Sequence, residues 1–298
     1  MMKGFQNIGN TCYLNSGLQM LIQNKDLCKL IIKYASQSKI LNTIAQFINE
    51  YYTSSNSSIS PDEIKKIVQE RQELFYGHQQ QDSSEFVVFL LDIIDEEIKK
   101  VDENKEGIKP IFGIDFNIRI KCKLKSCLQI SNKAEVNNFL LLDINSNSSN
   151  YSNSFQENKE NKDINDLYRQ FKSSDKLEDD NKYLCSRCKV KRIASKRSEI
   201  IHWPDHLIIW LKRYKQNGMN IQKNNESIIP NSEWRRGYKL YGGIIHSGGL
   251  NGGHYIYIGK NEDDNKWYIY DDSHVSEINE ERVESALGRA YWLYYKKN

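Results

Sequence analysis

The sequence predicts an α+β protein, with a helical first third followed by a sheet-rich remainder. Apolar residues recur at helical spacing through the first hundred residues, as in the stripe from Phe86 to Ile98. From Ile111 onwards the pattern alternates between apolar and polar residues, which is typical of strands with one buried face. The 298 residues are 39% hydrophobic and 27% charged, a globular composition. They can fill one large domain or two modest ones.

The segment from Asn7 to Ser16 leads into the first predicted helix. Apolar residues follow Cys12 at helical spacing, so we expect a helix to begin at or just after it, capped by Asn10 or Thr11. Unpaired N–H groups and the helix dipole lower the pKa of a cysteine at such a position. The alternative is that Cys12 is a small buried hydrophobic residue. The polar turn before it argues against burial.

Two later helices begin with capping sequences. In Ser60-Pro61-Asp62-Glu63 the serine caps, the proline takes the first helical position and the glutamate closes a capping box. Asp82-Ser83-Ser84-Glu85 repeats this pattern before the stripe that starts at Phe86, which we interpret as core. The preceding amide-rich segment, residues 77 to 82, can hydrogen-bond an extended peptide. A solvated loop is its alternative.

The remaining elements are mostly strands. Helical spacing returns once, from Ile164 to Phe171, whereas residues 145 to 162 are so rich in Asn, Ser, Glu and Lys that we predict a floppy insertion. The strands are expected to form a mixed or antiparallel sheet. They are predicted at Ile114–Ile120, Phe139–Ile144, Leu207–Leu211, Tyr238–Ile245, Tyr255–Ile258, Trp267–Tyr270 and Tyr291–Tyr295.

Four of the six cysteines form two close pairs. The spacing Cys185-x-x-Cys188 suits two thiolates on one structural zinc ion, and the other two ligands would be Cys122 and Cys127, four residues apart. Redox-inert thiols are the alternative. No export signal opens the chain at Met1, so we expect metal ligation in preference to disulfides and a cytoplasmic or nuclear location.

Charge and hydropathy exclude two classes of partner. The net charge is only +3 and no block of basic residues is present, so we expect no nucleic acid partner. The longest apolar runs, such as Leu207 to Leu211, are far too short to span a bilayer, so we expect no membrane partner.

A cysteine nucleophile needs a base, and the base needs a third group to hold its ring. His254 follows a glycine-rich segment, and Asp271 ends the next predicted strand. If those two strands pair, Asp271 accepts the Nδ1 proton of His254 and Nε2 faces Cys12. The Asn7 amide can stabilise an oxyanion. Taken alone, His254 can be a structural surface residue and Asp271 a turn former.

Several segments resemble the ubiquitin-specific proteases. Gly4 to Ser16 closely resembles the Cys box of that family, and Gly252 to Tyr255 with Trp267 to Val275 resembles its His box. Further similar signatures are Gln80 to Phe86, Tyr183 to Cys185 with Cys188, Leu207 to Tyr214, and a closing strand from Ala290 to Tyr295. The resemblance covers nearly the whole chain.

The resemblance implies a papain-like cysteine peptidase fold shaped as a hand. Residues 1–298 would be one catalytic domain, with a helical thumb in 1–105 and zinc-tied β fingers with part of the β palm in 106–213. The rest of the palm, with the His box, would lie in 214–298.

The same resemblance implies roles for individual residues. Cys12 would be the nucleophile, His254 the base, Asp271 the orienting acid and Asn7 the oxyanion donor, with Asp272 as a second supporting candidate. Residues lining the channel for the ubiquitin tail would be Gln81, Asp82, Glu85 and Tyr255.

The implied activity is that of a deubiquitinating cysteine protease that cleaves after the C-terminal glycine of ubiquitin. We expect a monomer with one structural zinc ion, no catalytic cofactor, and ubiquitin and ubiquitinated proteins as partners. One alternative is a catalytically inactive ubiquitin-binding module. The sequence argues against it, because every expected catalytic position is filled. Another is the same mechanism acting on a ubiquitin-like modifier.

Overall fold

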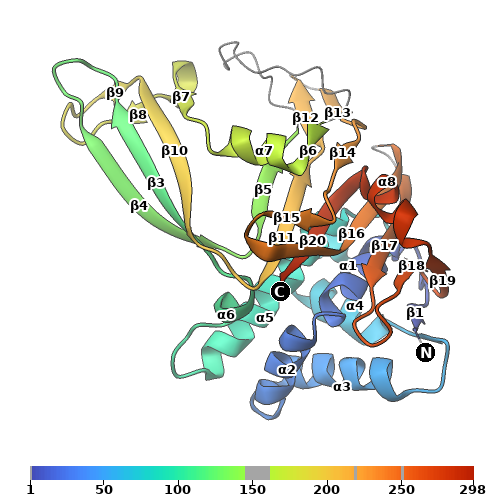
Figure 1. The fold of residues 1–298 in the computed structure, drawn as a ribbon. Helices are drawn as coiled ribbons and strands as arrows, with labels where there is room; N and C mark the ends of the chain where they lie inside the picture. The colour runs from blue at the N-terminus through green and yellow to red at the C-terminus, as the bar shows by residue number, and fades with distance from the viewer. Residues whose placement is uncertain (1, 145–161, 218–219, 250–251) are drawn as a thin grey trace.

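The computed structural model describes residues 2–144, 162–217, 220–249 and 252–298, and it shows the predicted mixture of helices and strands. Helices from the first third lie on one side of a central sheet, and a second sheet projects from the other end of the molecule (Figure 1). The insertion predicted at residues 145 to 162 lies outside the described residues, except for Lys162.

The first hundred residues form helices, as predicted. Asp82 caps the last of these, since its carboxylate accepts the N–H of Ser84 at 2.6 Å. The capping box predicted from Ser60 to Glu63 is wrong, because Glu63 pairs with Lys66 at 2.8 Å on the exposed helix face. The helices are α1 (Cys12–Ile22), α2 (Lys25–Tyr34), α3 (Lys39–Thr53), α4 (Asp62–Arg71), α5 (Ser83–Val101) and, shortly after them, α6 (Lys109–Phe112).

The palm is a large sheet in which neighbouring strands are antiparallel, except that β5 runs parallel to β11. Its order is β19 (His274–Ile278), β18 (Trp267–Asp271), β17 (Gly252–Lys260), β16 (Tyr238–Gly249), β20 (Ala290–Lys297), β11 (His206–Lys212) and β5 (Leu140–Asp143), with β15 (Glu233–Trp234) beside β16. All five strands predicted in the last third are present.

The two faces of the palm are covered by different elements. Alternate residues of one strand enter different cores, as Trp292 and Leu293 do on β20. Trp292 packs with the thumb helices, and its indole N–H donates to Ser84 Oγ at 3.1 Å. Leu293 packs with residues of α7 (Ile164–Phe171) and α8 (Val283–Leu287). The sheet therefore fixes the thumb against one face, with α1 packed on β17.

The fingers are a separate sheet with the order β4 (Ile130–Asn137), β3 (Ile114–Cys122), β10 (Ala194–His202) and β7 (Asp175–Leu177), with the small hairpin of β8 (Tyr183–Leu184) and β9 (Lys191–Arg192) near its end (Figure 1). The other short pairs are β1 (Gly4–Phe5) with β2 (Ser58–Ile59), β12 (Tyr214–Asn217) with β13 (Asn220–Lys223), and β14 (Ile228–Ile229) with β6 (Lys162–Asp163). Within the described ranges, no helix has the length and apolar character needed to cross a bilayer.

Candidate active site

Cys12 is the first residue of α1, and a tight turn precedes it. Gly9 and Asn10 both have positive φ, at 111° and 53°, which glycine and asparagine tolerate best. The turn is held from inside by Asn7, whose Oδ1 accepts the N–H groups of Gly9 (3.1 Å) and Thr11 (3.2 Å). Asn7 therefore fixes the chain that presents the thiol.

The thiol of Cys12 is buried, with 3% of the residue exposed. Burial raises its pKa above the ordinary value, and the nearby charge of Asp272 adds to this, while the main-chain N–H of Tyr255 lowers it. The expectations of an exposed thiol and a lowered pKa are both wrong. The reason is tertiary, since β17 covers the start of α1 and excludes water from it.

His254 lies on β17, and Asp271 is the last residue of the adjacent antiparallel strand β18. The two side chains meet, with His254 Nε2 2.6 Å from Asp271 Oδ1. We expected Nδ1 to make this contact, so that assignment is wrong. The paired residues nearest to them are Tyr257 and Tyr270, and both side chains lie beyond this point. The His254 ring therefore contacts Asp271 through Nε2, the ring nitrogen farther from the main chain.

Asp272 has more contacts than the sequence suggests. It adopts φ 49° in the turn after β18 and accepts two amides, from Asn7 Nδ2 at 2.8 Å and Asn15 Nδ2 at 2.7 Å. Its main-chain carbonyl accepts the N–H of Phe5 at 2.8 Å. Asp272 thus joins the turn before Cys12, helix α1 and the turn that carries Asp271.

These contacts bring the ends of the chain together at one place. A ring nitrogen of His254 and carboxylate oxygens of Asp271 and Asp272 all lie within 4.8 Å of one another. Cys12 is close to Asp272 and to the N–H of Tyr255, the residue after His254. Sequence reasoning missed Asn15, although its place one helical turn after Cys12 puts it on the same helix face.

The four residues predicted to line a peptide channel lie on two elements. Tyr255 on β17 is buried and donates its hydroxyl hydrogen to Asp82 Oδ2 at 3.3 Å, across the boundary between palm and thumb. Gln81 is half-buried just before α5, and Glu85 is exposed in its first turn. The structure thus brings Asp82 and Tyr255 into contact.

Gln80, beside the predicted Gln81, makes a contact that sequence reasoning missed. Its Nε2 donates to the carbonyl of Gly253 and its Oε1 accepts the N–H of Gly253, both at 2.9 Å. The side-chain amide of Gln80 therefore pairs with the main chain immediately before His254. The amide-rich run before α5 was the available signal.

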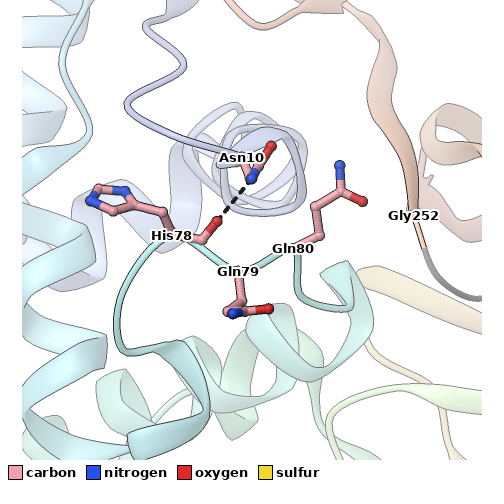
Figure 2. A pocket seen from close by; sticks show the side chains of 5 residues that line it. All are labelled: Asn10, His78, Gln79, Gln80 and Gly252. Atoms are coloured by element: carbon pink, nitrogen blue, oxygen red, sulfur yellow. Dashed lines mark hydrogen bonds between the residues drawn. The ribbon is translucent and has the colours of Figure 1, made fainter.

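An open hollow of about 520 Å³ lies beside this contact, lined by Asn10, His78, Gln79, Gln80 and Gly252. Figure 2 shows that its wall is polar, with the Asn10 amide directed at the His78 carbonyl at 2.9 Å. Amide groups can donate and accept, so this surface suits the backbone of a peptide.

The four finger cysteines lie together, as predicted. All four Sγ atoms are within 4.8 Å of one another, and those of Cys127 and Cys185 are 3.6 Å apart. A tetrahedral zinc ion with bonds of about 2.3 Å separates its sulfur ligands by roughly 3.8 Å, so the cluster fits this metal. Leu128 and Lys189, directly after the two pairs, both have positive φ. The longer Cys122–Cys127 spacing therefore still closes into a ligand turn.

Comparison with known proteins places the whole chain in one group. The sequence model described as ubiquitin carboxyl-terminal hydrolase matches residues 3–295. Ubiquitin carboxyl-terminal hydrolase 2 of Bos taurus is 26% identical over 341 residues, covering 98% of this chain and 54% of that protein. Usp2 of Drosophila melanogaster is 25% identical over 336 residues, covering 99% and 34%. The chain thus spans about half of the first relative and a third of the second.

Solved structures with the same fold confirm the predicted hand-shaped architecture. The SAGA DUB module, Ubp8 with Sgf11, Sus1 and Sgf73 bound to monoubiquitin, aligns with a TM-score of 0.77 at 23% identity, covering 99% of this chain and 69% of that one. The same module bound to ubiquitin aldehyde gives 0.74 at 22% identity, with the same coverages.

Proposed function

The chain belongs to the ubiquitin carboxyl-terminal hydrolase family, and from this premise we propose that it is a deubiquitinating cysteine protease. The observation that carries the proposal is the meeting of Cys12, His254, Asp271, Asp272 and Asn7 at one site. They come from the two ends of the chain, and each has a chemical part in thiol hydrolysis. The substrate is the bond after the C-terminal glycine of ubiquitin.

The reaction begins with a neutral thiol, because burial raises the pKa of Cys12. His254 takes the thiol proton as sulfur attacks the glycine carbonyl and forms an S–C bond. Asp271 stabilises the imidazolium that results. The Asn7 amide has two hydrogens, one of which is bonded to Asp272, so the other is available to the oxyanion.

The tetrahedral adduct then breaks its C–N bond. His254 returns the proton to the departing lysine amine, which leaves a thioester on Cys12. A water molecule, deprotonated by His254, attacks the thioester carbonyl, and the C–S bond breaks to release the carboxylate and the thiol. No catalytic cofactor is needed for this sequence.

We propose that the tail of ubiquitin runs past Gln81, Asp82, Glu85 and Tyr255 towards Cys12. Support comes from the Asp82–Tyr255 contact and from the polar hollow beside Gln80, which offer donors and acceptors to an extended backbone. Zinc bound by Cys122, Cys127, Cys185 and Cys188 would hold the end of the fingers together.

We also propose that the protein is a monomer in the cytoplasm or nucleus, without nucleic acid or membrane partners. All six cysteines are unpaired thiols, which supports a reducing compartment.

Hydrolysis of a fluorogenic ubiquitin C-terminal amide tests the activity. The wild-type chain should release the fluorophore, Cys12→Ala should abolish release while still binding ubiquitin, and His254→Ala should nearly abolish it. Undiminished turnover by Cys12→Ala contradicts the proposal. Parallel assays with ubiquitin-like modifiers show whether one of these is the true substrate.

A further inference from the structure

The hairpin end that carries His254 is built almost without side chains. Gly248 and Gly249 end β16, and Gly252 and Gly253 begin β17, directly before His254. Gly248 is paired with Gly253 and Gly249 with Gly252, and none of the four has a side chain with which to pack. Glycine strands gain nothing from side-chain packing and lose much backbone freedom on ordering. A general base that must stay within hydrogen-bond reach of a thiol therefore needs other elements to hold this backbone.

Lys223, the last residue of β13, supplies such a contact. Its Nζ donates to the carbonyls of Gly248 at 2.9 Å and His246 at 3.1 Å, and lies 3.2 Å from His246 Nδ1. The two carbonyls flank Ser247, and Ser247 is the residue paired with His254 across the ladder. The Lys223 ammonium group thus fixes β16 on both sides of Ser247, the residue opposite His254.

The main chain that carries Lys223 is held in place by Arg213. Arg213, before β12, has 1% of its surface exposed and donates to the carbonyls of Ala290 (2.7 Å), Glu226 (2.8 Å) and Gly288 (2.9 Å). Its own carbonyl accepts the N–H of the residue after Lys223 at 2.7 Å. The main chain next to Lys223 is therefore connected, through Arg213, to the turn before β20.

A second path leads from Lys223 to the thiol. The His246 ring stacks on Tyr255, with centroids 4.3 Å apart and planes at 24°. Burial, and then the charge of Lys223, lower the pKa of His246 to about 4, so at neutral pH its ring is uncharged and Nδ1 can accept from Lys223. The N–H of Tyr255 faces Cys12 Sγ. Lys223 thus reaches the surroundings of the thiol through this stacked pair, in addition to fixing the strand opposite His254.

We propose that Lys223 is a positioning residue that orders the glycine hairpin and so holds His254 in register with Cys12, while Gln80 holds the same hairpin at Gly253. Lys223 acts through the carbonyls of His246 and Gly248 and through the His246 ring, and it does not contact the reacting atoms of Cys12 or His254. The inference rests on the proposed deubiquitinating activity for its kinetic consequence, but its structural consequence does not depend on that activity.

The kinetic test compares three variants of the full chain on the fluorogenic ubiquitin amide. Lys223→Met removes the donors at similar length, and kcat should fall by about 10- to 100-fold with KM changed less than about threefold. Lys223→Arg keeps the charge and donors and should recover most of kcat. The matched control is Lys239→Met at the other end of β16, where the Lys239 ammonium pairs with Glu233 at 3.8 Å, and this variant should behave as wild type.

The structural test measures hydrogen exchange of main-chain N–H groups by mass spectrometry. In Lys223→Met, exchange in residues 252–257 should rise by about tenfold or more, while residues 290–297 of β20 keep the wild-type rate. This readout applies even if the wild type hydrolyses no ubiquitin, so failure of the proposed activity is seen separately.

Two results overturn the inference. One is unchanged exchange in residues 252–257 of Lys223→Met. The other is an active wild type for which Lys223→Met keeps kcat within about twofold, or loses activity only through KM. If Lys223→Met does not fold, Lys223→Gln and Lys223→Arg are compared in the same two assays. Equal kcat and equal exchange in that pair contradict the proposal, because only Arg retains the positive donor group.

Discussion

At the residue scale, the two neighbouring carboxylates have different partners and so different expected roles. Asp271 contacts the imidazole, whereas Asp272 holds the amides of Asn7 and Asn15. Asp271 thus controls the base, and Asp272 controls the oxyanion donor and the start of α1.

Replacing each carboxylate by its amide separates these roles. Asp272→Asn should lower kcat by about 10²- to 10³-fold, the cost of losing one oxyanion donor, because Asn7 loses its orienting acceptor. Asp271→Asn should lower kcat throughout the pH range in which the enzyme is active, since it removes stabilisation of the imidazolium formed during the reaction. Steady-state kinetics across pH measure both effects. An Asp272→Asn enzyme with wild-type kcat shows that Asn7 does not depend on Asp272.

The pH dependence of Cys12 follows from its burial. Its pKa is raised, so the thiolate is scarce at neutral pH and increases as the pH rises. Alkylation of the free enzyme by iodoacetamide, with Cys12→Ala as the blank, should therefore increase with a midpoint above about 8.5, the value of a free cysteine. A rate that is already at its plateau at pH 7 contradicts this.

Sequence reasoning named residues that the structure brings together at the candidate site, but it did not predict their environments. The identities of Cys12 and His254 follow from motifs, but burial of the thiol depends on how β17 lies over α1. The imidazole nitrogen that meets Asp271 depends on where the β17–β18 pairing ends. Lys223 belongs to no motif, and Asn15 was given no role within the Cys box, because the acceptors of both side chains are known only from the fold.

At the scale of elements, the cysteine cluster at the end of the finger sheet fits a structural zinc ion. The purified protein should contain about one zinc per chain, and Cys185→Ser should lose the metal and make β8 and β9 sensitive to protease. Cys28→Ala is the matched control, because Cys28 is buried outside the cluster and donates to the Ile22 carbonyl. Fewer than about half an equivalent of zinc in the wild type counts against the site.

His246, near the end of β16, should make the free energy of unfolding depend on pH. The pKa of His246 is about 4 in the folded chain and about 6.5 when unfolded, so the unfolded state binds the proton first as pH falls. The stabilisation is complete above pH 6.5 and is lost as pH falls towards 4, by at most about 3.4 kcal/mol at about 1.36 kcal/mol per pKa unit.

Denaturant unfolding at several pH values measures this dependence. His246→Phe keeps an aromatic ring against Tyr255 but does not titrate, so its free energy of unfolding should change less between pH 6.5 and 4 than that of wild type. His202→Phe, at an exposed position, is the control and should retain the wild-type slope. Parallel curves for wild type and His246→Phe show that His246 is not the group responsible.

Elements with strong periodicity were predicted well, and those held by main-chain contacts were not. Strand β4 was missed because most of its residues are polar and exposed, so no alternation marks it. The strand predicted at Tyr255–Ile258 begins earlier, at Gly252, because the glycines before it pair through their main chain. The cap of α4 was misassigned because Glu63 binds Lys66 instead.

At the scale of the whole molecule, the fold places side chains from both ends of the chain at one point. The first helix lies against β17, and the turn after β18 is bonded to Phe5, Asn7 and Asn15. The α+β class was predictable from periodicity, and the papain-like fold from the family resemblance. The contacts of Asp272 that align the site were not, because they join Asp272 to residues more than 200 positions away.

The central claim is that this convergence makes Cys12 the nucleophile for the ubiquitin C-terminus. The most direct measurement is covalent labelling with a ubiquitin that carries a C-terminal electrophile, followed by peptide mass spectrometry. The wild-type chain should gain one ubiquitin at Cys12, His254→Ala should react more slowly, and Cys12→Ala should not react. No adduct with the folded wild-type protein, or an adduct at another cysteine, would contradict the account.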